Sequence, residues 1–369
     1  MTASTPSVAS HQAWAREFAA EAVGPVGHVL DRMDSHEAVA PGSPVFDLMA
    51  QAHREGFTRL PLPRSAEYAM LEELARADAG LAAVLITSPQ PFRWIGAEPR
   101  AEWIGCCAPG RGSGSRVRAV RHGGGWLLTG STSAWVTGAA YATHALVVCA
   151  LDGSMQSLAF VPLDRPGVRR GPPLDLLGLR AQGRARIALD GVRLLPEELA
   201  VARPGEVDGI RALAHAAAAV IAVGIARAAY DGTVRLAHED VYDDRALVEH
   251  DDVRRRLMRM VVLLEAARSI AGAVYVETGG RIDAGETPSV QHAAAAHAFA
   301  TEAAYEIVDC AMVLCGGRAD AAGAVEYLDG STFHPQKLLR DAQSYTTDRR
   351  RRAWDSSRTP TRSLASSTL

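Results

Sequence analysis

The spacing of apolar residues divides the chain into three zones. In the first zone, residues 65–86 read SAEYAMLEELARADAGLAAVLI, with apolar residues at intervals of three and four and charges on the opposite face. This pattern predicts one amphipathic helix over the whole stretch, packed against a larger body. Proline-rich breaks at 41–44 and 60–65 separate it from earlier helical patterns. We therefore expect an N-terminal helical domain over residues 1–103.

The second zone alternates apolar and polar residues in short runs. Residues 116–136, RVRAVRHGGGWLLTGSTSAWV, predict two strands around a turn of three glycines, which supply the positive φ angles that a hairpin needs. Further short apolar runs near 144–151, 156–164 and 185–194 carry Asp-Gly turn signals. These runs predict a small antiparallel β domain of sandwich or barrel type over residues 104–203.

The third zone returns to a helical period with much longer segments. The Ala-rich stretch 208–241 contains strong helix formers, and the stretches 253–280 and 289–317 each end in Gly-Gly, a helix stop signal. A shorter amphipathic stretch follows at 338–354. We expect a four-helix bundle over residues 204–369 and an α+β, mostly α fold for the whole chain.

Composition excludes several classes of protein. The chain of 369 residues is 48% hydrophobic and 22% charged, with a formal net charge of −3, as is typical of an ordinary globular protein. A net charge this small produces no strong electrostatic field that would attract nucleic acid or an anionic membrane. No apolar run in the sequence suggests a leader or a membrane span. The five cysteines form no CxxC pair, so we expect neither a metal site nor disulfides. A cytoplasmic location is the corresponding expectation.

Trp135 and Thr137 are the first residues that indicate chemistry. They stand two apart in an expected extended segment, so their side chains should point the same way. A flat apolar ring beside a hydroxyl suits a flat heteroaromatic ligand with polar edges. The same pattern is also typical of a sandwich strand with a core Trp and an edge Thr, so both interpretations stay open at this point.

The order of the three zones and several local motifs together resemble the acyl-CoA dehydrogenase family. CAPGRGSGS at 107–115, GWLLTGSTSAWVTGA at 125–139 and LLGLRAQGRARIALDGVRLLPEEL at 176–199 are similar to family segments of the middle domain. AVGIARAAYD, CGG and LLRDA match positions in the family's helical bundle, in the same order along the chain. The resemblance covers almost the whole chain, although no single motif is specific.

The resemblance implies bound FAD, with this β segment against its flavin ring. Trp135 would then cover the isoalloxazine, and Thr137 or nearby backbone would bond its polar edge. By the same matching, Cys107 takes the position of a Thr that touches the flavin. Ser113 takes that of a Ser beside the thioester arm of the substrate.

The resemblance also implies a second chain at the cofactor. The family holds the FAD pyrophosphate across a subunit boundary, so backbone at Gly316 and Gly317 would approach it. Arg245 would pair with phosphate, for which a guanidinium is well suited. A homodimer or homotetramer follows, with an electron-transfer partner or a flavin reductase as a further possible partner.

The positions where the family carries its catalytic glutamate are occupied by other residues. By motif counting they are Arg349 and Ala214, so neither of the usual carboxylates is present. Asp348 and His215, each one residue away, are the candidate acid–base groups. Each also has a plain structural interpretation: Asp348 as a carboxylate paired with the surrounding arginines, and His215 as a packing residue on an Ala-rich helix.

Three functions remain compatible with these residues. The first is a flavin oxidoreductase acting on an acyl thioester or on a carrier-bound or specialised metabolite. The second is a two-component monooxygenase that receives reduced flavin and needs no α-proton base. The third is a non-redox enzyme or binding partner that has lost FAD, with His215, Asp348 and Tyr345 as candidates for proton transfer.

Overall fold

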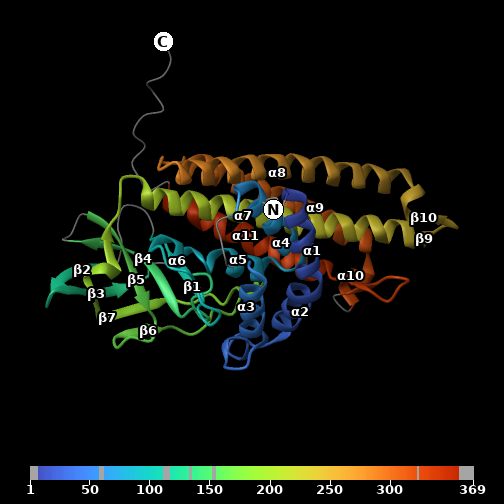
Figure 1. Cartoon of the computed structure of the whole chain (residues 1–369). Coiled ribbons are helices and arrows are strands. Elements are labelled where there is room, and N and C mark those ends of the chain that lie inside the picture. Colours follow the sequence, from blue (N-terminus) through green and yellow to red (C-terminus); the bar gives the residue numbers. More distant parts are fainter. Residues whose placement is uncertain are drawn as a thin grey trace, which may run out of the picture.

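The structure is a computed structural model of the chain, and it describes residues 7–57, 62–110, 117–132, 135–151, 155–321 and 324–356. Side chains are described for these residues except 155, 320–321 and 347–356. Figure 1 shows the β domain at one end of a long helical bundle, with the N-terminal helices packed across the middle of the bundle. This arrangement is an α+β fold with mostly helical content, as predicted.

The N-terminal region is built from short helices. The described helices are α1 (Val8–Phe18), which continues through a π-helical turn into α2 (Gly24–Arg32), then α3 (Pro44–Glu55), α4 (Arg64–Ala77), α5 (Ala79–Thr87) and α6 (Gln90–Trp94). Their apolar faces share a core with the bundle, to which Phe18, Leu48 and Leu81 each contribute a buried side chain.

The prediction of one helix over 65–86 is wrong, because the helix breaks at Asp78. The backbone of Asp78 is extended, with φ −154°, and its Oδ1 accepts a hydrogen bond from the Leu81 backbone N–H at 2.7 Å. An aspartate in this geometry caps a new helix, so α5 starts in a new direction after α4. The apolar spacing continues through this corner, so spacing alone does not reveal the break.

Asp78 also joins a buried ionic cluster with Lys337, the only lysine in the chain. Lys337 Nζ lies 2.9 Å from Asp78 Oδ2 and 2.7 Å from Asp341 Oδ2, and Asp341 Oδ1 accepts the Leu179 backbone N–H. Burial opposes the charged form, but the two carboxylates outweigh it and raise the pKa of Lys337 above its usual value. The charged cluster connects the N-terminal helices, the β domain and the last helix.

The β domain contains one eight-stranded sheet in the order β6-β7-β3-β2-β4-β5-β8, with β1 paired to β4 off this path. Its strands are β1 (Gly105–Ala108), β2 (Val117–His122), β3 (Gly125–Ser131), β4 (His144–Leu151), β5 (Met155–Pro162), β6 (Val168–Arg170), β7 (Ile187–Leu194) and β8 (Leu199–Val201). Most pairings are antiparallel, but β4 pairs in parallel with both β1 and β2. The sheet is therefore mixed, which corrects the expectation of a purely antiparallel domain.

The C-terminal region is a bundle around α7. The long helices are α7 (Glu206–Glu239), α8 (Asp251–Asp283), α9 (Val290–Cys315) and α11 (Pro335–Ser356). Gly224 lets α7 lie directly against α4, because a Cβ there would come within 2.5 Å of the Ala75 Cβ. The smaller elements lie between these helices: the hairpin β9 (Val241–Tyr242) and β10 (Arg245–Ala246), then α10 (Gly317–Ala321), β11 (Val325–Glu326) and β12 (Thr332–Phe333).

Within the described residues, one helix is long and apolar enough to span a bilayer by length and composition. This helix is α7, which corrects the expectation that no segment would reach that length. In its most apolar window, 78% of the residues are buried inside the protein. The apolar surface of α7 is therefore accounted for by its place at the centre of the bundle.

Candidate functional site

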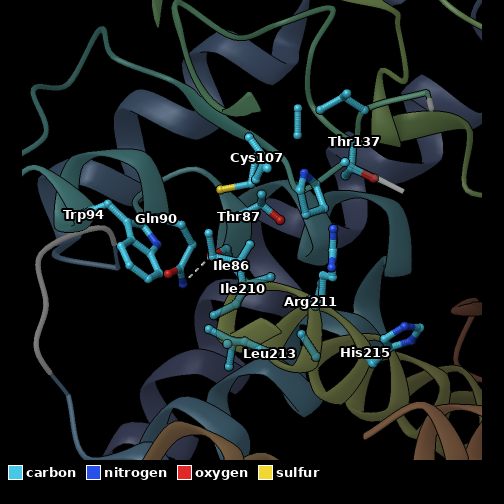
Figure 2. Close-up of a pocket in the computed structure, with 18 of the residues that line it drawn as sticks. Ile86, Thr87, Gln90, Trp94, Cys107, Thr137, Ile210, Arg211, Leu213 and His215 are labelled. Atoms are coloured by element: carbon cyan, nitrogen blue, oxygen red, sulfur yellow. Dashed lines mark hydrogen bonds between the residues drawn. The ribbon is translucent and has the colours of Figure 1, made fainter. Parts of the chain in front are cut away.

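A cavity of about 1500 Å³ lies where the β domain meets the helices. Its wall is formed by the N-terminal helices α4 to α6, by strands β1 and β4, by the first three turns of α7 and by the C-terminal end of α8. Figure 2 shows part of this wall, where Ile86, Thr87 and Gln90 face Ile210 and Leu213 of α7. The cavity is large enough for an extended ligand with both a flat and a linear part.

Trp135 and Thr137 both line this cavity. Val136 between them forms a β-bridge with Ala185 and is 4% exposed, so its side chain occupies the sheet core. Thr137 begins a turn, in which the Ala139 backbone N–H donates to the Val136 carbonyl at 3.3 Å, so it reaches the cavity from a turn and not from an extended strand. The Arg186 guanidinium lies 4.7 Å from the centre of the Trp135 ring, which holds the indole by a cation–π contact.

Cys107 contributes a neutral thiol to the same wall. It comes from β1, and Figure 2 shows its sulfur on the side where α5 and α6 approach. Burial raises the pKa of the Cys107 thiol to about 12. The thiol therefore stays protonated at neutral pH and acts as a small packing group and not as a nucleophile.

His215 is half-buried, lines the cavity from α7 and is paired with a second histidine. Its Nδ1 lies 3.2 Å from Nδ1 of His297 on α9, which is 2% exposed. One of these two nitrogens must carry the hydrogen that joins them. The ring of Tyr345 on α11 meets His297 edge-on, with centroids 5.9 Å apart. The three side chains form a line from the cavity into the bundle.

Arg211 provides positive charge one helical turn before His215. Residues four apart lie on the same face of a helix, and both residues line the cavity. Figure 2 shows Arg211 and His215 on the same helix as Ile210 and Leu213. Arg211 Nη1 also contacts Asp208 Oδ1 at 3.2 Å, which anchors the guanidinium to the first turns of α7.

A group of charged and polar side chains, the α4–α8 ionic wall, lines another part of the cavity. Glu67 is 4% exposed and accepts hydrogen bonds from Arg64 at 2.7 Å, from Arg93 at 3.1 Å and from the Tyr275 hydroxyl at 3.4 Å. Arg64 also makes a two-pronged contact with Asp283. The α4–α8 ionic wall is thus Arg64, Glu67, Arg93, Tyr275 and Asp283.

Three predicted cofactor residues lie at the other end of the bundle. Arg245 is exposed on the β9–β10 hairpin, where its Nη2 is 3.5 Å from His250 Nδ1. Gly316 and Gly317 lie at the end of α9, and a Cβ on either would meet open space. Figure 1 shows this end of the bundle remote from the β domain. Within one chain, these residues do not join the cavity.

Two further predicted residues, Ser113 and Asp348, have no described side chain. Ser113 lies outside the described residues. Asp348 belongs to α11, but its side chain is not among those described, and the same holds for Arg349. Ser344, one turn before Asp348 on the same helix, lines the cavity, so α11 does contribute to this site.

Sequence reasoning missed His297, Glu67 and Arg93. His297 is 82 residues from His215, and one of two histidines in an Ala-rich helix gives no local signal of a partner. Glu67 reads as an ordinary polar position in a helix, yet it is buried. Arg64 at the i−3 position was the one available hint of an ion pair.

Comparisons with known proteins agree with the resemblance. Residues 210–347 match the family model described as acyl-CoA dehydrogenase, C-terminal domain. The mouse mitochondrial short-chain specific acyl-CoA dehydrogenase is 27% identical over 335 residues, covering 82% of this chain and 79% of the mouse protein. The 3-(aryl)acrylate reductase of Clostridium sporogenes is 24% identical, covering 82% of this chain and 86% of that protein.

The same family is found among solved structures. A glutaryl-CoA dehydrogenase from Mycobacterium smegmatis, solved in complex with FADH2, superposes with a TM-score of 0.74. The match covers 93% of this chain and 90% of that chain, at 20% sequence identity. At this identity the likeness establishes a shared fold, and function has to be argued from the residues of the cavity.

Proposed function

Because the chain belongs to the acyl-CoA dehydrogenase family, we propose that it is a flavin-dependent oxidoreductase that acts on an acyl thioester. The observation that carries the proposal is one cavity lined both by Trp135 and Thr137 of the β domain and by His215 of α7. A flat-ligand surface and an acid–base group therefore line the same cavity.

The lining fits the flavin of FAD. The Trp135 ring is held from one side by Arg186 and offers an apolar surface to a flat ring, while Thr137 supplies a hydroxyl beside it. The small, uncharged side chain of Cys107 leaves room for close approach. FAD supplies the hydride acceptor in such a reaction. The residues of this chain bind and orient the reactants and move the proton.

His215 is the proposed acid–base residue. With His215 Nδ1 donating to His297 Nδ1, the other ring nitrogen of neutral His215 is unprotonated and accepts the α-proton of the thioester. His297 acts as a positioning residue that selects this tautomer. Arg211, one turn away on the same face, favours negative charge that develops on the substrate carbonyl. A histidine would thus replace the carboxylate that the family carries.

The substrate is restricted to a class, an acyl thioester, and not to a named compound. The names of the relatives include both a dehydrogenase and a reductase, so overall similarity selects neither direction of the reaction. In the reducing direction, the same imidazole would donate the proton. Both directions need the same geometry between His215 and the α-carbon.

We further propose that the protein acts as a homo-oligomer. Arg245, Gly316 and Gly317 lie too far along the bundle to reach the cavity of their own chain, as Figure 1 shows. A neighbouring copy could bring them to the phosphates of a bound FAD. Met258 and Val262 of α8 and Val313 of α9 expose more than half of their surface, which suits a contact between bundles.

The proposal predicts one FAD per chain in an assembly of at least two chains. Purified protein is incubated with excess FAD and desalted, and absorbance and light scattering are then measured on the same sample. Flavin bands at near one equivalent, with a molar mass at least twice that of the chain, are expected. A monomer without flavin bands would contradict both parts of the proposal.

A further inference from the structure

Two arginines flank Ala185, the residue that pairs with Val136 in the β domain. The Val136 backbone N–H donates to the Ala185 carbonyl at 2.8 Å, and the Ala185 N–H donates back to the Val136 carbonyl at 3.3 Å. Both of these residues are buried. The flanking residues differ in exposure, since Arg184 is half-buried and Arg186 is exposed. The two arginines therefore lie beside the segment that carries the proposed flavin contacts.

Arg186 brings a positive charge to the Trp135 ring. Its guanidinium carbon lies 4.7 Å from the ring centre, and no carboxylate in the described part of the chain pairs with it. A cation over one face of an indole is attracted by the electrons of the ring. A flavin on the other face of the indole would therefore have a positive charge one ring away.

Arg184 lines the cavity itself, as does Thr137. Its Nε–H donates to Oε1 of Gln182 at 2.5 Å, and Gln182 is 1% exposed, so a buried amide orients the guanidinium. The Gly138 backbone N–H donates to the Gln182 carbonyl at 2.8 Å, which joins the turn at Thr137 to the segment that carries Arg184. Figure 2 shows Thr137 on the β-domain side of the cavity. A second guanidinium therefore lines the same side of the cavity as the Thr137 hydroxyl.

Hydride transfer changes the charge of a flavin. The oxidised isoalloxazine ring is neutral, and a hydride brings two electrons and one proton, so the reduced ring carries one additional negative charge. A nearby cation stabilises that charge, and it does so more strongly beside a cavity wall than in bulk water, because the effective dielectric constant is lower. Charge close to the ring nitrogens is one of the means by which a protein tunes a flavin. Two guanidinium groups on this side would thus favour the reduced state over the oxidised state.

We propose that Arg184 and Arg186 stabilise reduced FAD relative to oxidised FAD and thereby raise the midpoint potential of the bound flavin. Arg184 acts from the cavity wall, and Arg186 acts as a positioning residue through Trp135. The flavin then becomes a better hydride acceptor for a saturated thioester. This inference rests on the proposed function, because it assumes that FAD lies against Trp135 and Thr137.

The test measures the midpoint potential of the FAD-loaded protein by equilibration with reference dyes, together with the dissociation constant of oxidised FAD. R184Q is expected to weaken the binding of reduced FAD about tenfold more than that of oxidised FAD, which lowers the midpoint potential by about 30 mV. R186Q is expected to have a smaller effect of about threefold, or about 15 mV, because this guanidinium is exposed and screened by salt. R184K should keep most of the wild-type potential, since lysine retains the charge.

R193Q is the matched control, because Arg193 is an exposed arginine on β7 outside the cavity lining, and its potential should equal that of wild-type protein. Loss of support for the Trp135 ring alone would weaken both redox states of FAD equally, so a shift in potential distinguishes charge from packing. Equal potentials for R184Q and R193Q would overturn the assignment of Arg184, and equal potentials for R186Q and R193Q that of Arg186. Where R184Q does not take up FAD, R186Q still decides, because an exposed side chain can be changed without disturbing the core.

The two levels of inference fail in distinguishable ways. If wild-type protein binds no FAD, the proposed function itself is contradicted, and the role of the two arginines falls with it. If FAD binds and exchanges electrons with a thioester, but neither substitution moves the midpoint potential, the proposed function stands. Only the role of Arg184 and Arg186 is then wrong.

Discussion

The substitution His215→Gln is expected to lower the rate of thioester turnover by about a hundredfold to ten-thousandfold, the usual contribution of a positioned general acid–base group. Glutamine keeps a hydrogen-bonding side chain of similar reach towards His297, but it cannot accept and release a proton near neutral pH. The measurement is the single-turnover rate of flavin reduction under anaerobic conditions with saturating thioester, so that substrate affinity does not enter.

Two controls separate chemistry from structure in this experiment. H238N alters an exposed histidine near the opposite end of the same helix and should leave the rate unchanged. H297N removes the positioning partner while keeping His215, so it should shift the pH dependence of the rate as well as lower it. A rate for H215Q within threefold of the wild-type rate would contradict the assignment and direct attention to Asp348 on α11.

The substitution Trp135→Ala is expected to weaken FAD binding by about tenfold to a hundredfold. Stacking of a flat heteroaromatic ring on an aromatic side chain contributes roughly 1 to 3 kcal/mol, and alanine removes that surface entirely. W135F should retain most of the affinity, because a smaller ring still stacks. The dissociation constant is measured by titrating the apoprotein with FAD and following flavin fluorescence.

The chain offers a matched control for this prediction. Trp126 on β3 is also stacked by an arginine, with Arg121 4.7 Å from its ring centre, the same distance as between Arg186 and Trp135. Trp126 lies outside the cavity lining. W126A therefore removes an equivalent cation–π pair without removing a proposed flavin contact. Equal FAD affinity for W135A and wild-type protein would show that Trp135 does not cover the flavin.

Periodic features of the fold were predictable from the sequence, and features that depend on partners distant in the chain were not. The long helices α7, α8 and α9 follow from apolar periods and Gly-Gly stops. The corner at Asp78 was missed, because an aspartate within an apolar period is interpreted as a polar surface position. Its cap on Leu81 is local, but its pairing with Lys337 depends on a residue about 260 positions away.

The candidate site shows the same contrast between local patterns, which the sequence reveals, and distant partners, which it does not. Trp135 and Thr137 were predicted to share one face from alternation in an extended segment, a purely local rule. The structure brings both to the cavity, although Thr137 lies in a turn. His215 was found through its position in a motif. Its partner His297 and the ion pair between Arg93 and Glu67 could not be found this way, because each is defined by how separate helices meet.

The central claim is that an acyl thioester exchanges electrons with FAD in this cavity, and an anaerobic titration of the FAD-loaded protein tests it most directly. Oxidised protein is titrated with saturated thioesters, and photoreduced protein with the corresponding enoyl thioesters, while the flavin absorbance is followed. The account predicts bleaching in the first titration or reoxidation in the second, complete at about one equivalent per flavin. A flavin that binds both kinds of thioester without any change of redox state would contradict it.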